Sequence, residues 1–577
     1  MLNRSKRLSG LVAIAAASVL VLGACSGGGG GDKKEQSSPG FAECDAKPNV
    51  CNTAKTKSGG TMVIAMEKTI PNWNQFDSDG NVYETGQVIN GLAPNMFFYY
   101  PDSTVHMNED LLASAELTSQ SPQTAVYKIK PAAVWNDGTP ISAKDFQMFW
   151  KMQNGKDCPD CTVASTSGYE VIDSVEGSDN DKTVTVKFKE VFPDWKGLFQ
   201  QLYPAHVAAK AGGDLTTPAG LAKAYEAFKT ETPTWSGAAY KIGNYQKDVS
   251  VELVPNDKWY GKTKPALEKV IYKVIEDQAQ QVPAMQNKEV QVLVSQPNQD
   301  IVTKVQGMTG VNYNLSKGPT WEHLDLNNKN AALADMELRK AIFTAVDRKA
   351  IIDKTIGTFF KGAAPLNNHN IMNGAPGYKD VITSTGQGAG NVDAAKKILT
   401  DAGYKIEGGK LINKAGQPVP QLRMRYTVGN VLRQQSSELI QGQLKQIGVD
   451  LKIDPTPKLG NTLSTGDFDI IIYAWVGSPF LAAQKDLWHT KGGSNYTKWS
   501  NPQADKLLEE AAKTLDDAKL RDLFNQADEI MAKEANVLPL YQKPVFLAAY
   551  SDYVNIRNNS TLQGPSYNNQ EWGLKAS

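Results

Sequence analysis

The feature that most constrains the fold is an alternation of predicted helices and strands in the second half of the chain. A helical run over residues 436–447 ends at Gly448 and leads into a β-rich run over 449–453. A second helical run, 393–402, ends in the same way at Gly403. Glycine is common just past a helix C-terminus because it tolerates a left-handed backbone. Helices that alternate with strands predict α/β lobes.

Further elements of the chain fit the same class. Residues 335–353 carry a helical stripe of apolar side chains, which predicts one long helix. Asn501 followed by Pro502 is a typical helix start, and apolar stripes continue from there to Met531. Short β-rich runs predict strands at 61–65, 126–129, 184–188, 251–254, 270–274, 290–294 and 470–473.

Length and composition agree with a large globular body. The chain has 577 residues, of which 41% are hydrophobic and 21% are charged. This ordinary usage excludes a mostly disordered chain, a coiled coil and a multi-span membrane protein. Lys+Arg and Asp+Glu both number 61, so the chain has no overall basic field for nucleic acid.

The N-terminus has the pattern of an export signal. Three bases among the first seven residues precede an apolar run over 11–22, which is too short for a comfortable membrane-spanning helix. The run ends at Leu22-Gly23-Ala24-Cys25, which resembles a bacterial lipobox and predicts lipidation of Cys25 after removal of residues 1–24. A plain signal peptide with an incidental cysteine is the alternative. Glycines and polar residues follow, and they predict a flexible tether over 25–58.

The four other cysteines support an exported chain. Their even number predicts two disulfides, and of the three possible pairings we favour the local one, Cys44–Cys51 with Cys158–Cys161. Cys158 and Cys161 also have the spacing of a redox motif, but their flanks are typical of a loop. Four thiolates could bind zinc, although the spacing within the first pair is unusual for that metal.

No motif in the sequence proposes a reaction. The five histidines include no metal-spaced pair, and no Gly-x-Ser-x-Gly nucleophile motif is present. We therefore predict no enzyme activity, no cofactor and no metal.

Several segments resemble extracytoplasmic solute-binding protein family 5, the dipeptide/oligopeptide-binding lipoproteins of ABC importers. The most recognisable is 135–145, WNDGTPISAKD, in which a turn precedes a Ser142 N-cap. The tether and the extra cysteine pairs are similar to an actinobacterial branch of that family. Further matches follow in the family's order at 237–242, 255–260, 326–328, 338–342, 346–348, 393–399, 402–404, 495–496, 500–502 and 505–508.

The resemblance implies an α/β bilobal periplasmic-binding-protein fold of the large, three-subdomain type. Two hinge crossings, near 316–327 and 537–541, would join the lobes, and the ligand cleft would lie between them. Lobe I is expected at 59–317 plus 535–577, with a subdomain near 86–185, and lobe II at 318–534.

The resemblance also implies partners. The protein would be a monomer, lipid-anchored on the extracytoplasmic face of the bacterial cell membrane. It would capture a peptide ligand and deliver it to ABC permease transmembrane subunits, which work with cytoplasmic ATPase subunits. Two alternatives stay open: the same fold with a non-peptide ligand (a glycolipid, a sugar or a metal chelate), or a regulatory lipoprotein that transports nothing.

Site residues follow from the resemblance by position. Trp475 matches a family tryptophan, and Ser478 stands where the family has the aspartate that binds the peptide's free amino group. A hydroxyl binds an ammonium more weakly than a carboxylate does. Trp73 and Asn74 lie in the family's first inter-lobe loop, and Tyr169 is at the position of a cleft tyrosine.

The presumed crossing strand supplies the remaining candidates. Trp321, His323 and Asp325 alternate along it and so share one face. Asp325 takes the place of a family carboxylate and is the expected replacement anchor for the amino group. For His323 and Asp325 the alternatives are a hydrogen-bonded strand histidine and a structural ion pair.

Overall fold

The computed structural model describes residues 37–44 and 46–577 of this mixed α/β protein. The predicted signal segment 1–24, Cys25 and the first part of the predicted tether lie outside the described residues. Within the described part, none of the helices combines the length and apolar character that a membrane crossing needs.

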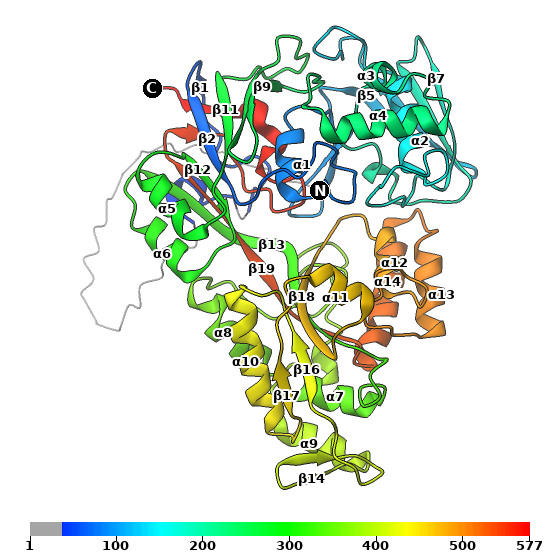
Figure 1. Ribbon diagram of the computed structural model, residues 1–577, viewed down its shortest axis with the longest axis vertical. Helices are drawn as coiled ribbons and strands as arrows, with labels where there is room; N and C mark the ends of the chain where they lie inside the picture. Colours follow the sequence, from blue (N-terminus) through cyan, green and yellow to red (C-terminus); the bar gives the residue numbers. More distant parts are fainter. Residues whose placement is uncertain (1–36, 45) are drawn as a thin grey trace, which may run out of the picture. The chain divides into compact units, whose positions relative to one another are not determined.

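A ten-stranded mixed sheet is the main element of the fold, and its two longest strands, β13 (Val311–Leu326) and β19 (Val537–Tyr550), lie side by side near its middle (Figure 1). They pair antiparallel from Val311 opposite Tyr550 to Asp325 opposite Val537. The other strands, in order across the sheet, are β17 (Leu451–Ile453), β16 (Leu422–Arg425) and β18 (Ile470–Val476) before β13, and β12 (Val292–Ser295), β2 (Thr61–Met66), β11 (Lys269–Val274), β10 (Ser250–Pro255) and β9 (Tyr240–Gln246) after β19.

A separate antiparallel sheet has the order β5 (Leu112–Gln120), β6 (Gln123–Ile129), β8 (Thr183–Phe188) and β7 (Ile172–Ser178). Helix α2 (Ala143–Gln153) packs against β7. Three small sheets complete the described part of the chain: β1 (Thr56–Lys57) with β21 (Gly573–Lys575) and β20 (Tyr553–Val554), β3 (Phe97–Tyr99) with β4 (Val105–Met107), and β14 (Lys405–Glu407) with β15 (Lys410–Ile412).

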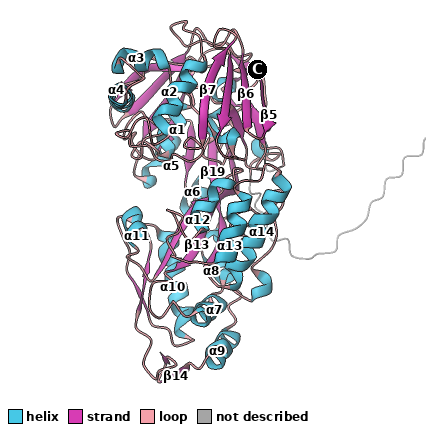
Figure 2. Ribbon diagram, turned by 90° about the vertical axis from the view of Figure 1, so that its right-hand side faces the viewer, coloured by secondary structure: helices cyan, strands magenta, loops and turns pink. Residues whose placement is uncertain are grey.

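Three pairs of helices pack closely within the described residues: α13 (Pro502–Ala511) with α14 (Asp517–Lys533), α3 (Ala205–Gly212) with α4 (Pro218–Thr230), and α7 (Met336–Ala345) with α9 (Val392–Asp401). Helices α13 and α14 lie side by side in Figure 2. The remaining α-helices are α1 (Tyr83–Ile89), α5 (Gln278–Gln286), α6 (Gln299–Gln306), α8 (Arg348–Lys354), α10 (Val431–Lys445), α11 (Leu459–Thr465) and α12 (Lys485–Trp488).

Most of the predicted elements are present. The predicted helix starts are confirmed at Ser142, whose hydroxyl accepts from the Lys144 N–H, and at Asn501, whose side chain accepts from Gln503 and Ala504. The single helix predicted over 335–353 is wrong. It is interrupted at Asp347, which has an extended backbone and caps α8 by accepting from the Ala350 N–H.

The cysteines pair locally, as favoured: Cys44 with Cys51 and Cys158 with Cys161. The predicted flexible tether is wrong in its second part, because described residues before 58 are folded onto the body. Phe41 is 1% exposed in the core, and the Ser38 N–H donates to the Tyr313 carbonyl of β13. Buried side chains and strand-like pairing are incompatible with a free linker.

Candidate functional site

The register between β13 and β19 shifts at two points, between Lys317 and Trp321 and between Glu322 and His323, and the first shift forms a bulge in β13. Lys317 stands opposite Pro544 and Trp321 opposite Gln542, so three residues of β13 face one residue of β19. This bulge consists of Gly318, Pro319 and Thr320. Proline has no N–H to give to a ladder, and bulges are where sheets accommodate it. The bulge therefore interrupts the regular pairing of β13 with β19 in the middle of the sheet.

A cavity of about 370 Å³ opens beside the bulge, and we call it the bulge cavity. Its volume is within the usual range for small-ligand sites, about 300–1,000 Å³. Its walls come from both of the predicted lobes. The lining residues that the structure describes are Cys44, Ala46, Pro48, Tyr100, Pro101, Asp102, Ser103, Asn314, Ser316, Lys317, Gly318, Pro319, Phe360, Asn370, Ile371, Met372, Asn373, Gly374, Ala375, Gly477, Ser478, Pro479, Leu481, Arg521, Gln542, Asn558 and Thr561.

The loop after β18 brings Ser478 to this cavity. The Gly477 N–H donates to the Pro319 carbonyl at 2.8 Å, which ties the loop to the bulge. The Ser478 hydroxyl accepts from the Phe480 N–H at 3.1 Å and so keeps the following turn tight. Ser478 is half-buried and lines the bulge cavity.

Residues from the first part of the chain hold the same loop from the other side. Asp194 is buried, and its carboxylate accepts from the Ala483 N–H at 2.9 Å. Burial raises the pKa of Asp194 to about 7, against the lowering effect of the Ala483 and Ala482 N–H groups. The Phe480 ring packs edge-on against Tyr99 with ring centres 5.6 Å apart. The loop is thus fixed by both predicted lobes.

The charges around the bulge cavity are few. Among the lining residues that the structure describes, Asp102 is the only carboxylate, and Lys317 and Arg521 are the only cations. Asp102 lies in the turn between β3 and β4 and accepts from the N–H and the hydroxyl of Thr104. Arg521 donates to Asp517 at 2.8 Å and to the Pro376 carbonyl at 3.2 Å.

Asp102 was missed in the sequence because its turn carries no motif. Its place in the wall of the bulge cavity depends on the packing of segments that are far apart in the chain.

Asp325 and His323 form a buried network instead of lining the cavity. The Asp325 carboxylate accepts from His323 Nδ1 at 2.7 Å and from the Tyr473 hydroxyl at 2.9 Å. The exposed fractions of Asp325 and His323 are 2% and 0%. Burial and the nearby Asp325 charge raise the pKa of Tyr473. The structure does not bring Asp325 to the bulge cavity as a replacement anchor, because its oxygens are already occupied inside the core.

The two tryptophans of this region extend the buried network. Trp321 is 1% exposed and packs against the His323 ring at 4.6 Å between ring centres. Trp475 is half-buried and stacks between His323 and Tyr496, with ring centres 6.3 and 5.9 Å away. Neither of them lines the bulge cavity.

The other expected contacts lie inside the first part of the chain. Trp73 and Asn74 are 4% and 3% exposed, and the Asn74 side chain accepts from the Phe76 N–H. Tyr169 is also buried, and its hydroxyl accepts from the Phe199 N–H at 2.8 Å. The Trp73 ring packs edge-on against Tyr245 at 4.8 Å between ring centres, and none of the three side chains lines the bulge cavity.

Two more cavities follow the same strands. One, of about 410 Å³, is lined by Thr320, Val476 and one side of α1, and the other, of about 590 Å³, is lined by Glu322 and the starts of α6 and α10. Lys543 borders both of them. Burial alone would raise the pKa of Glu322, but Arg433 and Lys543 lower it. The ion pairs of Glu322 with Arg433 and Lys543 therefore stabilise a charged carboxylate at the crossing strands.

Comparison with known proteins decides the family. The family model of bacterial extracellular solute-binding proteins, family 5 (middle region), matches residues 107–498. The chain belongs to this family. Its members are solute-binding proteins, and they share the bilobal periplasmic-binding-protein fold. Oligopeptide-binding protein OppA of Mycobacterium tuberculosis (strain ATCC 25618 / H37Rv) is 30% identical over 516 residues, which cover 88% of this chain and 84% of OppA.

Two solved structures of the family show what this fold holds in relatives. The periplasmic EDTA-binding protein EppA is 34% identical, with a TM-score of 0.88, and the match covers 92% of this chain and 99% of EppA. The Bacillus subtilis oligopeptide-binding protein AppA, solved with a nonapeptide, has a TM-score of 0.73 at 22% identity. This match covers 90% of this chain and 100% of AppA. The first relative is named for a chelator and the second was solved with a peptide.

Proposed function

We propose that the protein is the lipid-anchored substrate-binding component of an ABC importer and captures peptides in the bulge cavity. One observation carries the proposal: this cavity combines Ser478, at the family's amino-anchor position, with the carboxylate of Asp102. A carboxylate is the group that an ammonium binds most strongly through charge-assisted hydrogen bonds. Asp102 would therefore do what the family's aspartate does at position 478.

The rest of the cavity suits a peptide. Lys317 and Arg521 offer positive charge for a carboxylate at another point of the ligand.

Delivery follows from the fold and the N-terminus. Lipidation at Cys25 would hold the protein on the extracytoplasmic face of the membrane, close to a permease with its ATPase subunits. We place lobe I at 59–317 with 535–577 and lobe II at 318–534, joined by β13 and β19. Ligand contacts from both lobes would favour a closed state by hinge motion.

A second candidate ligand is a metal chelate or another polycarboxylate. The relative EppA is named for EDTA binding, and this chain lacks an acid at position 478. Lys317 and Arg521 would then bind the ligand's carboxylates. The Asp102 carboxylate would repel such an anionic ligand.

Native mass spectrometry of the protein purified without refolding separates the two candidates. A series of retained peptide masses supports peptide capture. A single chelate mass keeps the fold and contradicts the peptide assignment.

A further inference from the structure

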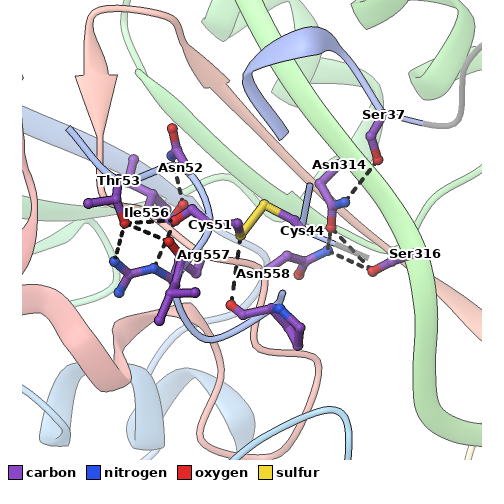
Figure 3. The surroundings of a disulfide bond; sticks show 12 residues. Ser37, Cys44, Cys51, Asn52, Thr53, Asn314, Ser316, Ile556, Arg557 and Asn558 are labelled. Carbon is purple, nitrogen blue, oxygen red and sulfur yellow. Dashed lines mark hydrogen bonds between the residues drawn. A yellow bond between two sulfur atoms is a disulfide. The ribbon is translucent and has the colours of Figure 1, made fainter. Parts of the chain in front are cut away.

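The disulfide between Cys44 and Cys51 closes a short ring that lies outside the segment matched by the family model (Figure 3). We call the described residues of this ring, Cys44 and 46–51, the stapled loop. The two cysteines are 5% and 0% exposed, so the disulfide is part of the core rather than a surface link.

The chain before the stapled loop is fixed to β13. The Ser38 N–H donates to the Tyr313 carbonyl at 2.9 Å, and Asn314 Nδ2 donates to the Ser37 hydroxyl at 2.9 Å. Phe41 then buries its ring in the core. This side of the loop therefore moves only if β13 moves.

The chain after the stapled loop is fixed to the C-terminal segment. Asn52 Nδ2 donates to the Ile556 carbonyl at 2.8 Å, and the Arg557 guanidinium donates to the Cys51 carbonyl at 2.9 Å and to the Thr53 hydroxyl at 3.1 Å (Figure 3). Arg557 is itself buried and paired with Glu571. Both ends of the stapled loop are thus clamped, and the disulfide joins them.

Cys44, Ala46 and Pro48 of this loop line the bulge cavity. Two other lining residues, Asn314 and Asn558, belong to the elements that clamp the loop. Asn558 Nδ2 donates to the Asn314 side chain at 2.8 Å. Moving the wall outward would break hydrogen bonds on both sides and strain the ring. A ligand that extends towards Ala46 therefore meets a wall that yields little.

We propose that the stapled loop determines ligand size: it is a fixed wall that stops the ligand at Ala46 and Pro48. The inference rests on the proposed function, which makes the bulge cavity the ligand site. A rigid wall selects by excluding longer ligands, and this kind of selection needs no specific contact with the ligands that fit.

Two matched substitutions in the same loop test the wall. Ala46→Trp fills the cavity at the wall, whereas Val50→Trp adds the same ring at a position that is 61% exposed and does not line the cavity. The probes are peptides of two to nine residues with a common N-terminal sequence, measured by competition in native mass spectrometry. For Ala46→Trp we expect at least tenfold weaker binding of the longest peptides that the unmodified protein accepts and less than twofold change for the shortest. Val50→Trp should keep the whole profile.

If the two variants bind peptides of each length equally well, the stapled loop does not limit ligand size, although the proposal of peptide capture still holds. If the unmodified protein binds Fe(III)–EDTA and no peptide, the peptide assignment fails, and chelators of increasing size then test the wall with the same pair of variants. If Ala46→Trp does not fold, Pro48→Ala tests the wall in the opposite direction. It enlarges the cavity and should improve the binding of the first excluded length at least threefold, and an unchanged limit would contradict the wall.

Discussion

The two ends of the region around β13 and β18 have opposite physical characters, although a few residues separate them. Towards the end of β13, the buried Asp325 carboxylate accepts from His323 Nδ1 and from the Tyr473 hydroxyl. At the bulge, Gly318 and Pro319 leave regular pairing and border a cavity with few charges. On this strand a polar side chain is therefore not by itself a sign of a ligand contact, because the polar groups near its end are engaged with one another inside the core.

The largest expected effect tests the buried half of this comparison. Asp325→Ala removes the acceptor of two buried donors, and each unpaired donor costs about 1–3 kcal/mol. We expect the free energy of unfolding, measured in urea, to fall by about 4 kcal/mol. Asp401→Ala, which removes an exposed acid paired with Lys397, should cost less than about 1 kcal/mol. Unchanged stability with weaker ligand binding would instead make Asp325 a ligand contact.

The next effect compares the two disulfides. Replacing either cysteine pair with alanines frees a short ring and should cost about 2 kcal/mol of stability. Loss of Cys44–Cys51 should also broaden the range of ligand lengths, because that ring lines the cavity. Loss of Cys158–Cys161 should leave the range unchanged, because it lies elsewhere. Thermal unfolding measures the stability of both variants, and native mass spectrometry measures the range of ligand lengths that they bind. A broadened range after loss of Cys158–Cys161 would contradict the role of the stapled loop in limiting ligand size.

A smaller effect concerns the cavity's carboxylate. Asp102→Asn keeps an acceptor for Thr104 but removes the charge. Peptides with a free amino group should bind about tenfold more weakly, as expected for one lost charge-assisted hydrogen bond. N-acetylated peptides should bind the variant and the unmodified protein equally in calorimetric titrations. A tenfold loss for both kinds of peptide would show that Asp102 shapes the cavity without binding the amino group.

The smallest expected effect comes from restoring the family's acid. Ser478→Asp places a second carboxylate at the cavity, and free-amino peptides should bind about threefold more tightly. Fe(III)–EDTA, an anion, should bind more weakly. Tighter binding of the chelate in the same titration would contradict the assignment of this position to an amino group.

The sequence could predict much of the fold, because its signals are local. Ser142 and Asn501 mark real helix starts, and the predicted strands lie in the sheets. The break at Asp347 was missed because a helical stripe continues across it, and only the cap shows that α8 starts anew.

The candidate site could be predicted only in part. Ser478 was found by its place in a family motif. Asp102 and Ala46 have no motif, and they reach the cavity through the packing of distant segments, which local patterns do not encode. His323 and Asp325 were placed on one face of a strand by their alternation, but alternation does not tell whether a face meets solvent or core.

Hydrogen exchange of backbone amides, measured by mass spectrometry with and without a bound peptide, tests most directly whether the bulge cavity holds the ligand. Ligand in the bulge cavity should slow exchange in 100–103, 370–375 and 477–479, which line it from three separate segments. Exchange in 323–326 should not change, because those amides are already inside the sheet. Protection confined to α6 and the start of α10, around the cavity of about 590 Å³, would contradict the central claim that the bulge cavity holds the ligand.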